Sequence, residues 1–264
     1  MAHHLSRAIL RMLGAAAVGA FIMASGSSLA YAEEVRNVVL VHGAFVDASI
    51  WDGVIRRLQR DGYEVRAVQL PLTSLAEDVA ATQAVLRRVD GPTVLVGYSW
   101  GGVPVSVAGV DSKVKGLVYF AAVTPDPGQS LKQMLAPYAE KAMPGMAAVQ
   151  RDDEDFLWLD PARFGFALAH DAPPDLVRVM AAAEKPTAER ILSDKPERAA
   201  WQSKPTWYAV STEDKIFPVQ LQRDLARKIG ARVIELPTGH ASILSRPDDA
   251  SALIENAAQT LSKR

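Results

Sequence analysis

The chain has 264 residues and a formal net charge of −1 at pH 7, with 49% hydrophobic and 22% charged residues. This composition is typical of a globular protein, and the length suffices for one domain with a sizeable core and an insertion. The near-neutral charge and the lack of a basic cluster with interleaved aromatic residues argue against a nucleic-acid partner. Because the chain has no cysteine, no disulfide supports the fold.

Residues 1–32 resemble a bacterial secretory signal peptide. Arg7 and Arg11 precede a long uncharged run that ends in the small-residue cleavage pattern Ala30-Tyr31-Ala32. A membrane anchor is the alternative, since the run approaches the ~20 residues that a span requires. The glycine and serine residues in the run and the cleavage pattern favour removal. We therefore expect export to the periplasm or the medium and no stable membrane insertion of the mature chain, which keeps 27 basic and 30 acidic side chains, a net charge of −3.

From Asn37 onward, short β-rich runs alternate with longer amphipathic stretches, the pattern of a mostly parallel sheet covered by helices. The predicted strands are Val38–Val41, Val65–Val68, Thr93–Val96, Gly116–Phe120, Thr206–Val210 and Arg232–Leu236. The predicted helices are Trp51–Arg60, Ser74–Val89, Trp100–Ala108, Val219–Ile229 and Asp248–Leu261. Ser74 and Glu77 predict a capping box at the start of the second helix. The fold class is therefore α/β, with about six strands and flanking helices.

The alternation breaks between Thr124 and Lys204, where Pro, Met, Ala and scattered aromatic residues predominate. A loop of this length without structure of its own is uncommon in a compact domain, so we predict an inserted helical cap over an active site. The predicted organisation is a signal segment (1–32), an α/β core (33–123 and 205–264) and the cap (124–204).

The most informative motif is Gly97-Tyr98-Ser99-Trp100-Gly101-Gly102, which follows the apolar run Thr93–Val96. A serine flanked by glycines at minus two and plus two, between a strand and a helix, is the pattern of a nucleophile elbow. At so sharp a turn, side chains at the two glycine positions would clash with neighbouring backbone, while the serine hydroxyl stands exposed. The motif predicts Ser99 as a nucleophile.

A serine hydroxyl is a weak nucleophile until a base takes its proton, so the motif also predicts a histidine. Outside the signal segment, the chain has His42, His170 and His240. His42 ends the first predicted strand and His170 falls in the cap. His240 follows the last strand, on a loop at the carboxyl edge of the sheet, where the active sites of open α/β sheets gather. We therefore predict His240 as the base.

A carboxylate should hold this histidine in the correct tautomer, and in chain order it should fall between the serine and the histidine. Asp214 fits because it lies just beyond the strand Thr206–Val210. Its neighbour Glu213 and Asp126, which follows the fourth strand, are the alternatives.

The tetrahedral intermediate of acyl transfer needs two backbone donors. We expect the amides of Trp100, after the nucleophile, and Ala44, after the first strand. Apolar side chains around these loops and in the cap suggest a pocket for an apolar acyl or aryl group. The candidate substrate-binding residues are Phe45, Trp51, Tyr98, Phe156 and Trp158, with Met134, Met143, Met146, Phe164 and Phe166 as further apolar residues of the cap.

Four motifs occur together in order: the run Val39–Phe45, the segment Pro71–Leu75, the elbow, and Thr212–Asp214 with Gly239–Ala241. Together they resemble the small bacterial serine α/β hydrolases, esterase-like enzymes related to plant methyl-ester esterases and hydroxynitrile lyases. The resemblance runs from Asn37 to the C-terminus and is weakest in the cap. It implies the α/β-hydrolase fold. One departure is at the elbow, where relatives read Gly-His-Ser-Tyr/Leu-Gly-Gly and this chain has Tyr98 and Trp100.

We expect a serine esterase that cleaves small-molecule carboxylic esters through an acyl-Ser99 intermediate. The alternatives are a hydrolase-fold protein that binds a small molecule with little turnover, a cofactor-free perhydrolase, and a hydroxynitrile-lyase-like enzyme. The lyases follow the triad histidine with a lysine, whereas here Ala241 follows His240. We expect no cofactor and no metal, because the sequence has neither a Gly-x-Gly-x-x-Gly motif nor metal-ligand spacing.

Overall fold

The computed structural model describes residues 34–138 and 142–263. The predicted signal segment lies outside these residues. Within the described ranges, no helix is long and apolar enough to cross a membrane.

A six-stranded sheet of parallel strands forms the centre of the fold, in the order β2-β1-β3-β4-β8-β9. Its strands are β1 (Asn37–Val41), β2 (Glu64–Val68), β3 (Thr93–Tyr98), β4 (Val114–Phe120), β8 (Thr206–Ser211) and β9 (Arg232–Leu236). All six predicted strands are confirmed within two residues at each end. The strands β3 and β8 are buried at every residue, as expected when helices cover both faces of a parallel sheet.

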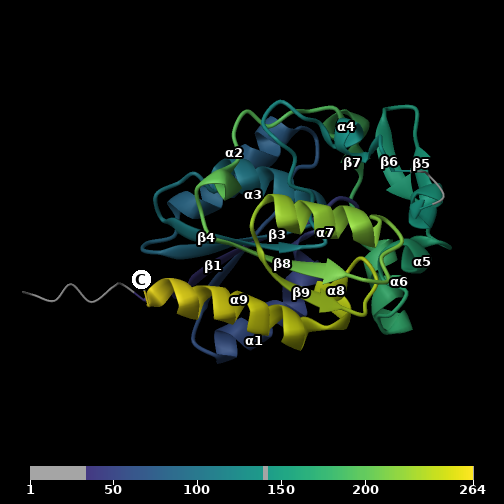
Figure 1. The fold of residues 1–264 in the computed structure, drawn as a ribbon. Coiled ribbons are helices and arrows are strands. Elements are labelled where there is room, and N and C mark those ends of the chain that lie inside the picture. The colour runs from purple at the N-terminus through teal and green to yellow at the C-terminus, as the bar shows by residue number, and fades with distance from the viewer. Residues whose placement is uncertain (1–33, 139–141, 264) are drawn as a thin grey trace, which may run out of the picture. The chain divides into compact units, whose positions relative to one another are not determined.

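Helices cover both faces of this sheet (Figure 1). The helices α1 and α9 pack together on one face, and α2, α3 and α7 lie on the other. Their bounds are α1 (Asp52–Arg60), α2 (Leu75–Arg87), α3 (Gly102–Ala108), α7 (Val219–Lys228) and α9 (Pro247–Ser262), which confirms the five predicted helices.

Only half of the predicted capping box at α2 forms. The Ser74 hydroxyl accepts a hydrogen bond from the Glu77 amide at 3.2 Å, as expected for an N-cap. The Glu77 carboxylate, however, accepts hydrogen bonds from the hydroxyls of Thr73 and Ser74. The carboxylate therefore binds side-chain hydroxyls, whereas in a capping box it would accept a hydrogen bond from the Ser74 amide.

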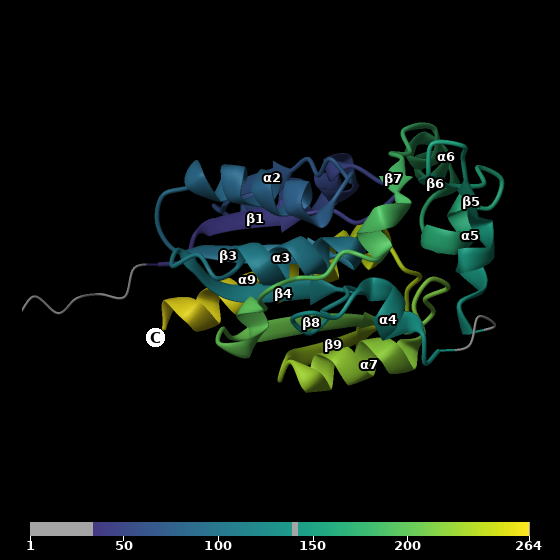
Figure 2. The ribbon, with the colours of Figure 1, turned by 90° about the horizontal axis from the view of Figure 1, so that it is seen from above.

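The segment between β4 and β8 contains the helices α4 (Leu131–Leu135), α5 (Phe164–Leu168) and α6 (Pro174–Ala182). It also contains a three-stranded antiparallel sheet of β5 (Val149–Arg151), β6 (Phe156–Leu159) and β7 (Thr187–Ala188), which was not predicted from sequence. The strands β5 and β7 have three and two residues, and all four residues of β6 are apolar, so the sequence shows no alternation of apolar and polar residues here. Figure 2 shows most of this inserted segment beyond the carboxyl ends of the parallel strands.

Candidate active site

Ser99 lies at the sharp turn between β3 and α3, in a short 3-10 turn (Ser99–Gly101). Its φ of +53° is in the left-handed region, which non-glycine residues rarely adopt. A Cβ added to Gly97 would lie 2.9 Å from the Gly101 carbonyl oxygen, and one added to Gly101 would lie 2.5 Å from that of His42. The backbone packing of this turn therefore requires the two glycines that the motif contains.

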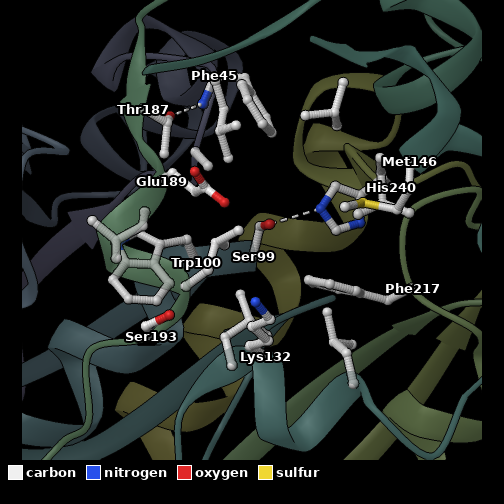
Figure 3. Close-up of a pocket in the computed structure, with 18 of the residues that line it drawn as sticks. Phe45, Ser99, Trp100, Lys132, Met146, Thr187, Glu189, Ser193, Phe217 and His240 are labelled. Atoms are coloured by element: carbon white, nitrogen blue, oxygen red, sulfur yellow. Dashed lines mark hydrogen bonds between the residues drawn. The ribbon is translucent and has the colours of Figure 1, made fainter. Parts of the chain in front are cut away.

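Ser99, His240 and Asp214 form a continuous hydrogen-bonded relay (Figure 3 shows its first link). The Ser99 Oγ lies 2.7 Å from His240 Nε2, and His240 Nδ1 lies 2.7 Å from Asp214 Oδ2. An ionised carboxylate only accepts hydrogen bonds, so Nδ1 carries the imidazole proton and Nε2 faces the serine hydroxyl. In this tautomer the imidazole can accept a proton from Ser99.

The Asp214 carboxylate is fully buried and held by four donors. Its Oδ1 accepts hydrogen bonds from the amides of Ile216 (2.7 Å) and Phe217 (3.0 Å), while its Oδ2 accepts from Gln222 Nε2 (2.8 Å) and from His240. Gln222 was not identified from sequence. The available signal was a polar residue among the buried positions of the amphipathic helix α7.

The two alternative acidic residues make contacts with residues other than His240. Asp126 pairs with Lys228 at 3.3 Å, and about half of its side chain is exposed. Glu213 is exposed, and its carbonyl oxygen lies 3.1 Å from Nε2 of the exposed His170. Of the three candidates, Asp214 is the one hydrogen-bonded to His240.

Two of the predicted substrate-binding residues instead belong to the core beneath the relay. The Tyr98 ring is buried and packs against the His240 ring, with centroids 5.2 Å apart, and Phe217 packs edge-on at 5.1 Å on the same imidazole. Trp51 is fully buried against Tyr98 and Phe120. Neither Trp51 nor Tyr98 lines the pocket above Ser99, which corrects the prediction for both. Tyr98 therefore supports the His240 ring and does not line the cavity.

The loop after β1 lies directly against Ser99. A Cβ added to Gly43 would lie 2.8 Å from the Ser99 Cβ. The buried His42 connects this loop to the loop after β2. Its Nδ1 donates a hydrogen bond to the Gly43 carbonyl (2.8 Å), and its Nε2 accepts one from the Leu70 amide (2.9 Å). Burial lowers the pKa of His42 to about 4, so this imidazole is neutral near pH 7. Ala44, the candidate oxyanion donor, is the next residue of the loop and lines the pocket.

Trp100, the second candidate oxyanion donor, is held by a buried carboxylate. Its indole Nε1 donates to Asp78 Oδ2 at 2.8 Å, and Asp78 Oδ1 accepts from the Leu72 amide at 2.8 Å. Burial raises the pKa of Asp78 to about 6, although both hydrogen bonds oppose this shift. Asp78 lies on α2 and was not identified from sequence.

The relay opens into a largely apolar cavity of about 500 Å³, within the size range of small-molecule sites. Phe45 lines it, as predicted from sequence, and Lys132 and Glu189 are charged residues at its wall (Figure 3). Glu189 also pairs with Arg151 at 2.8 Å. The aliphatic and sulfur-containing lining residues are Leu131, Leu135, Met146, Val149, Leu157, Leu168, Ile191, Leu192 and Ile216.

The predicted pocket residues Phe156 and Trp158 do not line this cavity. They alternate along β6 with the buried residues Leu157 and Leu159, and therefore face away from the core. The Trp158 indole Nε1 donates to Asp152 Oδ2 at 2.8 Å instead. Of the methionines named for the cap, Met146 is the one that lines the cavity.

Among the described residues, no group of three or more His, Cys, Asp or Glu side chains is arranged to hold a metal ion. The relay itself offers a hydroxyl, a base positioned to take its proton, and a carboxylate that stabilises the resulting imidazolium. This arrangement suits nucleophilic attack on an electrophilic carbon in the adjacent cavity.

Known proteins with a similar sequence cover most of the chain. A pyrethroid hydrolase from Sphingobium wenxiniae is 24% identical over 240 residues, covering 81% of this chain and 84% of its own length. A polyneuridine aldehyde esterase from Rauvolfia serpentina is 26% identical over 263 residues, covering 83% and 94%.

The solved structures agree on the fold. The crystal structure of a pyrethroid hydrolase from Sphingobium faniae superposes with a TM-score of 0.75 at 22% identity, covering 87% of this chain and all of the other. The sequence model of the alpha/beta hydrolase family matches residues 38–253. The predicted fold is confirmed, and the chain belongs to the alpha/beta hydrolase family.

Proposed function

We propose that the protein hydrolyses carboxylic esters of small to medium apolar acyl or aryl groups through an acyl-Ser99 intermediate. The observation that carries the proposal is the unbroken relay from Ser99 through His240 to Asp214, which opens into an apolar cavity.

In the acylation half-reaction, Ser99 Oγ attacks the ester carbonyl carbon as its proton moves to His240 Nε2. The carbonyl oxygen becomes an oxyanion, for which the Ala44 and Trp100 amides are the proposed donors. When the intermediate collapses, the bond to the alcohol oxygen breaks and His240 returns its proton to that oxygen. The alcohol leaves, and the acyl group stays on Ser99.

In the deacylation half-reaction, water takes the place of the alcohol. His240 accepts a proton from the water as the water oxygen attacks the acyl carbon, and then protonates Ser99 Oγ as the acid leaves. Throughout, Asp214 keeps the Nδ1 proton in place and stabilises the imidazolium. Its three further donors fix the carboxylate in this orientation.

The cavity and the relatives support the proposed substrate class. Aliphatic walls favour an apolar acyl or aryl group, since the cavity offers few polar partners. The names of the two relatives, a pyrethroid hydrolase and a polyneuridine aldehyde esterase, are consistent with ester hydrolysis. Ala241 stands after His240 where the resembling lyases have a lysine, which disfavours cyanohydrin chemistry.

The test is hydrolysis of p-nitrophenyl esters from acetate to decanoate by the wild-type protein and by Ser99→Ala. We expect many turnovers with a chain-length optimum for the wild type and loss of turnover in the variant. Release of at most one equivalent by the wild type would favour a small-molecule binding protein. Equal rates for the two proteins would overturn the proposal.

A further inference from the structure

The inserted segment reaches back to the loop that carries the candidate oxyanion donor Ala44. Phe45, the next residue, has a φ of +65°. Its amide donates to Thr187 Oγ1 at 3.1 Å, and its carbonyl oxygen accepts from the Lys185 amide at 3.3 Å (Figure 3 shows the Thr187 contact). Both backbone groups of a residue in a disfavoured conformation are therefore held by the insertion.

The Ala44 amide lies between two peptide units that are each fixed by one side chain. The Gly43 carbonyl and the Ala44 N–H belong to one planar unit, and His42 Nδ1 donates to that carbonyl. The Ala44 carbonyl and the Phe45 N–H belong to the next unit, which Thr187 holds. The backbone dihedrals of Ala44 are thus set from the core on one side and from the insertion on the other.

Thr187 is itself firmly placed. It is 1% exposed and pairs with Leu157 in the antiparallel sheet of the insertion. The amide of its neighbour Ala188 donates to the Leu72 carbonyl at 2.8 Å, which ties β7 to the loop after β2. An acceptor anchored in this way can hold the strained Phe45 amide in one position.

We infer that Thr187 is a positioning residue for catalysis: its hydroxyl holds the Phe45 amide and thereby aims the Ala44 amide at the oxyanion. This inference rests on the proposed function. Thr187 also lines the cavity, so its methyl group could matter for substrate binding alone. The experiment must therefore separate the hydroxyl from the size of the side chain.

Four side chains at position 187 distinguish the effect of the hydroxyl from the effect of size. For each protein, kcat and KM are measured on one p-nitrophenyl ester. Thr187→Val keeps the size and removes the hydroxyl, Thr187→Ser keeps the hydroxyl, and Thr187→Ala lacks both. Deleting an oxyanion donor outright costs about 10²–10³ in kcat, so misaiming one should cost about 10- to 100-fold. We expect wild type and Thr187→Ser to share a high kcat, Thr187→Val and Thr187→Ala to share a low one, and KM to stay within about twofold.

Phosphonylation of Ser99 by a p-nitrophenyl phosphonate gives a second measurement, because that reaction also develops charge on an oxygen in the same site. Its rate constant should fall in parallel with kcat, while urea midpoints identify any variant whose loss reflects unfolding. A kcat that groups by size, with Val like Thr and Ala like Ser, would overturn the inference, as would four equal kcat values or a loss confined to KM. An inert wild type would instead refute the proposed function, and this inference with it.

Discussion

The carboxyl edge of the parallel sheet and the inserted segment meet at one cavity, but they contribute different things to it. The sheet edge supplies Ser99, Asp214 and His240, each held by several directed hydrogen bonds or by an unusual backbone conformation. The insertion supplies mainly aliphatic walls. Its Thr187 hydroxyl also accepts a hydrogen bond from the Phe45 amide, next to the candidate oxyanion donor Ala44.

Because of this difference, we expect the reaction rate and the substrate preference to depend on different residues. Chemistry requires particular atoms at hydrogen-bond distance, so a change at the sheet edge should remove rate. Burial of an apolar group requires only surface and volume, so a change in the aliphatic walls of the insertion should alter which substrate is preferred. The following variants challenge that division.

The largest effect is expected for Asp214→Asn. An asparagine can turn its amide NH₂ toward His240 Nδ1, which favours the tautomer that carries its proton on Nε2 and cannot accept one from Ser99. We expect kcat to fall by about 10⁴-fold with little change in KM, measured on p-nitrophenyl esters. Asp126→Asn is the matched control and should keep wild-type kcat, because Asp126 pairs with Lys228. The reverse result would place the acid at Asp126.

Two buried groups beside the active site, His42 and Asp78, should give opposite dependences of stability on pH. The pKa of His42 is lowered to about 4, so its contribution to the free energy of unfolding is present above about pH 6.5 and is lost as pH falls toward 4. The pKa of Asp78 is raised to about 6, so its contribution to the free energy of unfolding is present below about pH 3.8 and is lost as pH rises through 6. Each pKa shift corresponds to about 3 kcal/mol.

Urea unfolding of His42→Gln and Asp78→Asn between pH 4 and 7 measures these contributions. The stability of wild type minus that of His42→Gln should grow by about 3 kcal/mol as pH rises from 4 to 6.5. The corresponding difference for Asp78→Asn should shrink by a similar amount from pH 4 to 6. Parallel profiles for all three proteins would show that neither group titrates as its burial implies.

The smallest effect is expected in the insertion, at β6. Leu157→Phe adds volume to a side chain that lines the cavity, so the chain-length optimum should shift toward shorter acyl groups, with a few-fold change in kcat/KM and kcat for acetate retained. Trp158→Phe changes the neighbouring side chain, which faces away, and should leave the optimum unchanged. A shift in the control alone would reverse the assignment of the two faces of β6.

The same contrast explains what could be predicted from the sequence. The central strands β3 and β8 are largely apolar runs that are buried at every residue, and the elbow needs glycine at fixed positions because backbone atoms lie within 3 Å of any added Cβ. The pairing of Ser99 with His240 and Asp214 followed from where parallel strands end. These features can be recognised in the sequence because each of them permits only a few residue types.

Contacts that depend on tertiary placement left weaker marks. The aromatic rings of Phe156 and Trp158 suggested a pocket, but the orientation of a four-residue strand decided which side chains face inward. Trp51 follows the loop after β1 and Tyr98 precedes Ser99, and both side chains are nevertheless buried in the core. Thr187 lies 142 residues beyond Phe45, so no local pattern could have joined the two.

The central claim is that Ser99 is the nucleophile activated by His240, and stoichiometric labelling tests it most directly. A p-nitrophenyl phosphonate should release one equivalent of p-nitrophenol per chain and leave its phosphonyl group on the peptide that contains Ser99, as read by mass spectrometry. Ser99→Ala should take no label, and His240→Ala should react far more slowly. A label on another residue, or ester turnover that survives in Ser99→Ala, would contradict the account.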